Sequence, residues 1–168
     1  MLSPPFYFAV AAACPPAPET APPPLPDRPP EMALGPDGVA HVLVQDPHAV
    51  CWWALAEDGE AALRAVWPLP GPHPVAIDVA ENGLVVFTGR TDAGWAVTTI
   101  APDGHTREIP LGNRGWLRRF EVDGLGTVAR LAWTEPSGTV YDRVNLRTGR
   151  IDELSRVSPP EDAHHAQQ

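Results

Sequence analysis

The chain has 168 residues, of which 43% are hydrophobic and 20% are charged, and its formal net charge is −9. This composition suits one domain with an apolar core, and the acidic balance gives no general attraction to nucleic acid or anionic lipid. All 12 basic residues are arginine, which excludes a P-loop and a pyridoxal Schiff base because both require a lysine.

The first 14 residues contain a short apolar run that ends in a cysteine. Residues 6–14 read Phe-Tyr-Phe-Ala-Val-Ala-Ala-Ala-Cys, which resembles the end of a bacterial lipoprotein signal peptide. The resemblance implies that Cys14 becomes the first mature residue and carries lipid. Residues 1–5 lack the positive charge that a signal peptide requires. The alternative is therefore an apolar N-terminus that packs on the domain or on a partner.

Residues 15–31 are predicted to form a proline-rich linker. Nine prolines lie between positions 15 and 30, and proline has a fixed φ and no backbone donor, so this segment favours an extended arm. At about 3.1 Å per residue the arm reaches roughly 50 Å. It suits a stalk between a lipid anchor and a domain outside the cytoplasm. The alternative is a cytoplasmic scaffold protein whose arm runs along a partner.

Residues 32–156 are predicted to form an all-β, antiparallel repeat domain, followed by a polar tail at 157–168. Turn signals such as Pro36-Asp37-Gly38, Glu81-Asn82-Gly83 and Pro102-Asp103-Gly104 separate runs of five to eight residues rich in Val, Ile, Thr and Trp. Residues 57–67 contain good helix formers, but their place in the repeat predicts a strand.

The spacing of the turn glycines predicts three repeat units. Gly38 and Gly83 are 45 residues apart, and Gly83 and Gly126 are 43 apart; a period of 40 to 45 with several strands is typical of propeller blades. Residues 79–111 and 124–154 resemble blades of the TolB-type β-propeller family, and residues 34–66 resemble them more loosely. Closed propellers have four to eight blades. Three units therefore predict an incomplete or distorted ring with open edges, and a compact β fold of another kind is the alternative.

The chain shows no recognisable catalytic or metal-binding motif. Its six histidines form no His-x-x-x-His pattern, and its serines form no Gly-x-Ser-x-Gly. His41 is expected to lie on a sheet face rather than to ligate a metal. We therefore expect a protein that is not an enzyme and has no cofactor or metal. A hydrolase or lyase that uses the central face of a propeller is the less favoured alternative.

One segment has the composition of an interaction surface. Residues 111–120 read LGNRGWLRRF, and Arg114, Trp116, Arg118 and Arg119 are residue types that dominate binding hot spots. The alternative is a connector between blades in which Trp116 fills a gap in the core. Together these features predict a protein-interaction or accessory subunit of a bacterial cell-envelope complex. Its location would be periplasmic or extracytoplasmic, with a protein partner and no nucleic acid.

Overall fold

The computed structural model describes residues 31–158, which form twelve strands and no helix. The strands make three four-stranded antiparallel sheets, and neighbours in the sequence pair throughout. The first sheet contains β1 (Glu31–Leu34), β2 (Ala40–Gln45), β3 (Ala49–Leu55) and β4 (Ala61–Pro68). The second contains β5 (His73–Val79), β6 (Val85–Thr91), β7 (Gly94–Ile100) and β8 (Thr106–Gly112). The third contains β9 (Trp116–Val122), β10 (Val128–Glu135), β11 (Gly138–Asn145) and β12 (Ile151–Val157).

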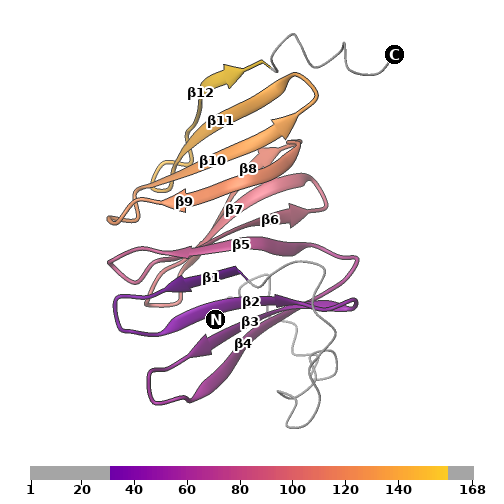
Figure 1. Ribbon diagram of the computed structural model, residues 1–168. Coiled ribbons are helices and arrows are strands. Elements are labelled where there is room, and N and C mark those ends of the chain that lie inside the picture. Colours follow the sequence, from indigo (N-terminus) through magenta and orange to yellow (C-terminus); the bar gives the residue numbers. More distant parts are fainter. Residues whose placement is uncertain (1–30, 159–168) are drawn as a thin grey trace, which may run out of the picture.

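The three sheets follow one another along the molecule as propeller blades do (Figure 1). The first strand of the second sheet, β5, contacts β1 and β2 on one side and β9 on the other. The first and third sheets stand at opposite ends of this stack, so the ring is not closed. The prediction of an all-β, antiparallel, blade-like fold with an incomplete ring is confirmed.

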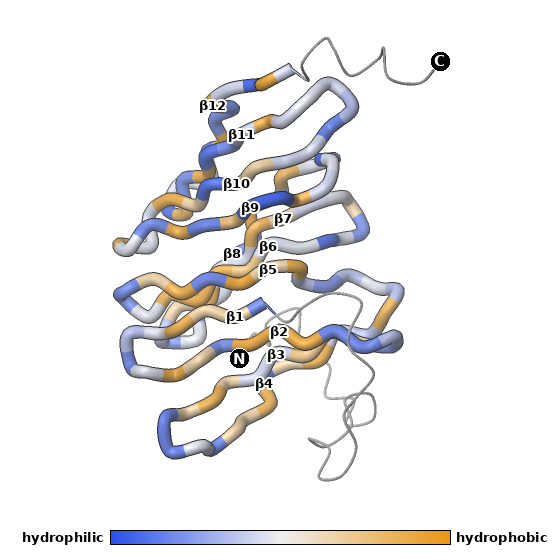
Figure 2. Tube along the Cα trace, in the orientation of Figure 1, coloured by the Kyte–Doolittle hydropathy of each residue, from blue (hydrophilic) through white to orange (hydrophobic). Residues whose placement is uncertain are grey.

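The turn sequences form the bends that their aspartates predict. Asp37, Asp58 and Asp103 each accept a hydrogen bond through Oδ1 from the backbone N–H two residues later, at 3.1, 3.0 and 2.9 Å. Such Asx turns reverse the chain locally. Polar segments consequently lie at the turns and apolar segments lie along the strands, as Figure 2 shows.

Two apolar cores hold the three sheets together. The larger core lies between the second and third sheets and includes Trp95, Leu131, Trp133 and Val140. The smaller core lies between the first and second sheets and includes Trp52, Trp67 and Phe87. In β10, alternate residues Ala129, Leu131 and Trp133 face the larger core, because successive strand residues point to opposite faces of a sheet.

The structure confirms one doubtful strand and contains strands that the sequence pattern did not predict. Residues 61–68 form β4, so the strand predicted within 57–67 is confirmed despite its helix-forming residues. The first strand of each sheet, β1, β5 and β9, was not predicted. Pro74 breaks the β5 pattern, and a register shift in the pairing with β10 breaks that of β9. Residues 113–115 connect β8 to β9, and Trp116 is the first residue of β9.

Candidate interaction surface

Within residues 111–120, the side chains of Trp116 and Arg119 lie on the outer face of the third sheet, the side turned away from the second sheet. Trp116 pairs with Thr134, and Arg119 pairs with Ala132. These partners alternate with Leu131 and Trp133, which face the core. Arg118 lies at the register shift between the two pairs and is exposed. Trp116 is 75% exposed, so in the described structure it fills no gap in the core.

Cross-strand pairing extends this surface over the middle of the third sheet. One row runs Glu121, Arg130, Arg143 and Asp152 across the four strands. The next row contains Arg119 and Tyr141, which is 40% exposed. With Arg118, the face holds four arginines and two carboxylates. It therefore carries an excess of positive charge on an acidic chain.

Arg114 has a different role from the other residues of the segment. Its Nε donates to Asp142 Oδ2 at 2.8 Å, and the Asp142 side chain is fully buried. The same oxygen accepts a hydrogen bond from Trp133 Nε1 at 3.0 Å, and Trp95 Nε1 donates to the Arg114 carbonyl at 3.2 Å. The indole rings of Trp95 and Trp133 meet edge to face, 4.9 Å apart. Arg114 thus neutralises a carboxylate in the larger core, and its contacts hold the residues just before β9 against that core.

Asp142 is the important residue that the search for sites in the sequence missed. Its signal was present, because Asp142 interrupts the apolar face of Val140 and Val144 in β11, which Leu146 continues just beyond the strand. A buried carboxylate requires a charged or hydrogen-bonding partner. That requirement points to an arginine, and the partner lies 28 positions earlier in the sequence.

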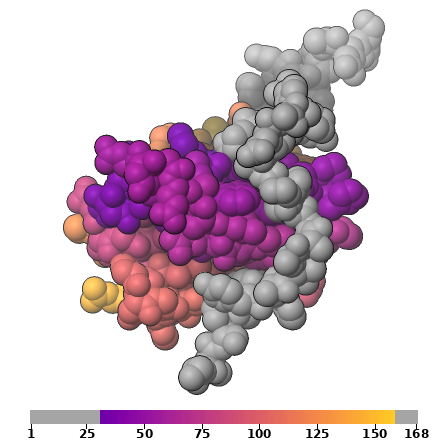
Figure 3. Space-filling model, turned by 90° about the horizontal axis from the view of Figure 1, so that it is seen from below, coloured from indigo at the N-terminus to yellow at the C-terminus, as the bar shows by residue number. Residues whose placement is uncertain are grey.

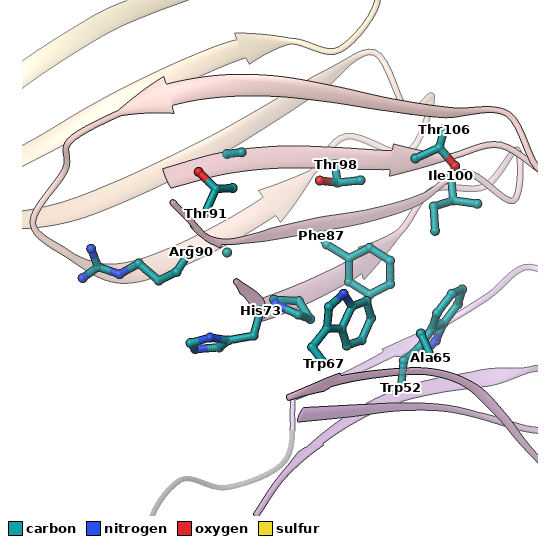
Figure 4. A pocket seen from close by; sticks show the side chains of 13 residues that line it. Trp52, Ala65, Trp67, His73, Phe87, Arg90, Thr91, Thr98, Ile100 and Thr106 are labelled. Carbon is teal, nitrogen blue, oxygen red and sulfur yellow. The ribbon is translucent and has the colours of Figure 1, made fainter. Parts of the chain in front are cut away.

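A pocket lies between the first and second sheets (Figure 4). Trp52 and Trp67 form its wall on the first sheet, and Phe87 and Thr98 face them from the second. Its volume is about 40 Å³, which is room for a few water molecules because one water needs about 10–15 Å³ by this measure. The pocket is a packing gap between diverging sheets rather than a site for a substrate of ordinary size.

The histidine of the first sheet is part of the packing beside this pocket. His41 Nδ1 accepts a hydrogen bond from Trp52 Nε1 at 3.2 Å, and the two rings stack with centroids 5.7 Å apart. Burial lowers the pKa of His41; the charge of Asp37 opposes this shift, and that of Arg64 adds to it. The neutral imidazole is the form that can accept the indole proton. His41 therefore lies on a sheet face, as expected.

The remaining findings concern the predicted lipid site, the proline-rich linker, metal-binding groups and membrane-spanning helices. Cys14, the residue expected to carry lipid, lies outside residues 31–158, as does the proline-rich linker up to residue 30. Within the described range, no group of three or more His, Cys, Asp or Glu side chains is arranged to hold a metal ion. The same range contains no helix that is long and apolar enough to span a membrane.

Comparisons with known proteins identify the fold. No protein-family model matches the chain, and no curated protein sequence matches it. TolB from Acinetobacter baumannii superposes with a TM-score of 0.56 at 11% identity, covering 74% of this chain and 31% of TolB. The virginiamycin B lyase of Staphylococcus aureus superposes with a TM-score of 0.54 at 18% identity, covering 78% of this chain and 42% of the lyase.

A third solved structure extends the range of functions that share this architecture. The dipeptidyl peptidase 4 of Porphyromonas gingivalis has a TM-score of 0.53 at 12% identity, and the match covers 74% of this chain and 18% of the peptidase. The chain thus spans 18% to 42% of these proteins' length. The likeness supports a β-propeller type of fold. Because the fold serves enzymes as well as other proteins, it carries no conclusion about catalysis.

Proposed function

We propose that this chain is a non-catalytic protein-interaction subunit of an extracytoplasmic complex in the bacterial envelope, and that it binds its partner through the outer face of the third sheet. The observation that carries the proposal is Trp116, which is 75% exposed beside Arg118 and Arg119. Tryptophan and arginine dominate interface energies because they combine a large contact area with directional donors. An indole that remains this exposed gains most by packing against a second protein.

The charge of the surface indicates the chemistry of the partner. Four arginines and two carboxylates lie on a chain whose net charge is −9. An acidic protein surface with an apolar recess for Trp116 would complement this pattern. Electrostatic complementarity of this kind accelerates association and fixes orientation.

The extracytoplasmic location is supported by two features of the chain. Residues 6–14 have the apolar-to-cysteine pattern of an exported protein. Cys51, in β3, is disulfide-bonded, and disulfides persist mainly in oxidising compartments. A cytoplasmic scaffold protein would instead keep Cys51 reduced. The redox state of Cys51 in protein taken directly from fractionated cells therefore distinguishes the two locations.

The test of the interaction is the double variant Trp116→Ala/Arg119→Glu, studied as a tagged protein in cells that produce the chain natively. We expect the tagged chain to run in a larger native complex, and the variant to shift to the size of the free chain. A hot-spot tryptophan alone contributes about 2 kcal/mol or more, a loss of roughly thirtyfold in affinity.

The matched control is Leu125→Ala/Arg147→Glu, which removes an exposed apolar side chain and reverses one charge in loops at the opposite end of the strands. The control should assemble like the unaltered chain, and both variants should keep its circular dichroism spectrum. A chain that migrates as a free monomer in native extracts contradicts the proposed function. Equal assembly of the two variants contradicts the choice of surface.

A further inference from the structure

The outer face of the first sheet, the side turned away from the second sheet, is apolar across all four strands. Pairing puts Val44, Cys51 and Val66 in one row of this face, and Met32 and Trp53 in the next. Every other paired position on this side of β1 to β4 also holds an apolar residue. None of these side chains belongs to either apolar core. Figure 3 looks at the molecule from the end that this sheet forms.

The opposite end of the stack shows that apolar character is not simply a property of an end sheet. On the outer face of the third sheet, the central positions hold Arg130 and Arg143, flanked by Glu121 and Asp152. That face is suited to water. A sheet face without a charged side chain at any paired position requires a covering layer, because an exposed apolar patch of that size promotes association.

Burial across the face shows where the cover lies. Ala49 and Cys51, on the central strand β3, are 0% exposed, whereas Met32 and Leu34, on the edge strand β1, are each 70% exposed. Within residues 31–158, contacts between the first sheet and other sheets run to the second sheet, on the other side. A layer over β3 must therefore come from outside the described residues.

We propose that residues 1–30 of the same chain form this layer, and that Cys14 is the partner of Cys51 in its disulfide. The chain enters the first sheet at Glu31, at the start of β1, and Cys51 lies two strands away. Two strand spacings are roughly 10 Å, whereas the sixteen residues between Cys14 and Glu31 can span roughly 50 Å. The reach is ample. The two cysteines are also the only two in the chain.

The composition of the segment suits a cover rather than an added strand. Residues 6–13 supply three aromatic rings followed by Val and Ala side chains, which match an apolar face. The prolines after Cys14 cannot donate ladder hydrogen bonds, so they favour an extended strap lying on the sheet. This inference is independent of the proposed partner surface, which lies at the other end of the molecule.

The disulfide requires an oxidant and excludes another use of Cys14. Each thiol loses one proton and one electron as the S–S bond forms, and the two electrons and two protons pass to a disulfide-class oxidant, which becomes a dithiol. A sulfur in this bond cannot also carry lipid as a thioether. The inference therefore replaces the lipid anchor expected at Cys14 with a covalent strap. Residues 6–14 then remain in the mature chain and are no cleaved signal, so the extracytoplasmic location rests on the disulfide alone.

The test is peptide mapping of the full chain, produced with export to an oxidising compartment and alkylated without reduction. A glutamate-specific protease cuts after Glu19, Glu31 and Glu57, so that Cys14 lies in fragment 1–19 and Cys51 in fragment 32–57. We expect these two fragments to be linked in protein that is monomeric on a non-reducing gel, and reduction to separate them. Trypsin is less suitable because Arg28 precedes a proline.

Three results would overturn the inference. A mature chain that starts at a lipid-modified Cys14 restores the anchor. Two copies of fragment 32–57 linked to each other make a second copy the occupant of the face. Alkylation of both cysteines shows that no disulfide exists. As an independent readout, reduction of the unaltered chain should raise binding of a dye for apolar surfaces several-fold, and Cys14→Ser should show the same binding before reduction. Unchanged dye binding in both cases would contradict the covering role.

Discussion

Replacing Arg114 with alanine tests whether the segment before β9 holds the third sheet in place. The variant leaves the Asp142 carboxylate, which is 0% exposed, without its charged partner at 2.8 Å. Removing one member of a buried ion pair typically costs 3–5 kcal/mol. The Arg114 side chain is 23% exposed, so water reaches part of the site and we expect the lower end, about 3 kcal/mol. For a domain of this size that loss lowers the melting temperature by about 10 °C.

The assay is urea unfolding followed by tryptophan fluorescence and by far-ultraviolet circular dichroism. Trp95 and Trp133 border the ion pair, so fluorescence reports on this region directly, and coincident transitions justify a two-state free energy. In the Arg114→Ala background, Asp142→Asn should recover at least about 1 kcal/mol, because it removes the uncompensated charge and keeps an acceptor for Trp133.

The control is Arg119→Ala, which breaks the ion pair with Glu121 on the surface. Those side chains are 71% and 46% exposed, so the expected loss is under about 1 kcal/mol. If Arg114→Ala is no more destabilising than this control, the buried ion pair does not support the third sheet and the reasoning fails.

Three further predictions concern the packing of the sheets. Gly115→Ala places a Cβ 1.9 Å from the backbone oxygen of Thr134 and should cost at least about 2 kcal/mol in urea unfolding; an unchanged midpoint would show that the backbone yields. Leu131→Ala, at a core position 2% exposed, should cost about 2–5 kcal/mol in the same assay. Since burial lowers the pKa of His41, the folded state should lose stability as the pH falls from about 6.5 to about 5, above the range in which carboxylates protonate. This loss should disappear in His41→Gln; a loss that persists in that pH range would exclude the Trp52 hydrogen bond as its cause.

The sequence predicts the fold because local rules and the repeat agree. Asp-Gly turns and alternating apolar residues identify most of the second, third and fourth strands of each sheet, and a period near 44 residues places them in successive units. The first strands of the sheets could not be predicted from the sequence, for a physical reason. β9 reads WLRRFEV. Its two consecutive arginines interrupt the alternation that identifies a strand, and the sheet accommodates them through a register shift at Arg118.

The site is less predictable because its parts come together only through pairing between strands. The exposure of Trp116 depends on which side of β9 faces the second sheet, and a shift of one residue would have buried it. Arg114 and Trp116 are two residues apart and look equivalent in the sequence. Asp142 separates them in function, because it draws Arg114 into the core while Trp116 remains in solvent.

The charges on the outer face of the third sheet lead to a final prediction, which concerns association of the protein through that face. Arg130 and Arg143 occupy its central strands, and their charge should keep this face from stacking on another sheet. Replacing both with valine would give it an apolar centre like that of the first sheet. Burying such a face against its own copy is the simplest way to cover it, because a two-fold axis matches identical surfaces.

We therefore expect Arg130→Val/Arg143→Val to form dimers that dissociate at roughly micromolar concentration, as an interface of about 800 Å² per partner allows. Sedimentation velocity over a hundredfold range of concentration measures this directly. The control Arg147→Val/Arg150→Val removes the same charge from the loop between β11 and β12 and should stay monomeric. If both variants remain monomeric with native spectra, charge does not prevent stacking at this end. If both associate, the lost net charge rather than the face is responsible, because only the first variant makes the sheet apolar.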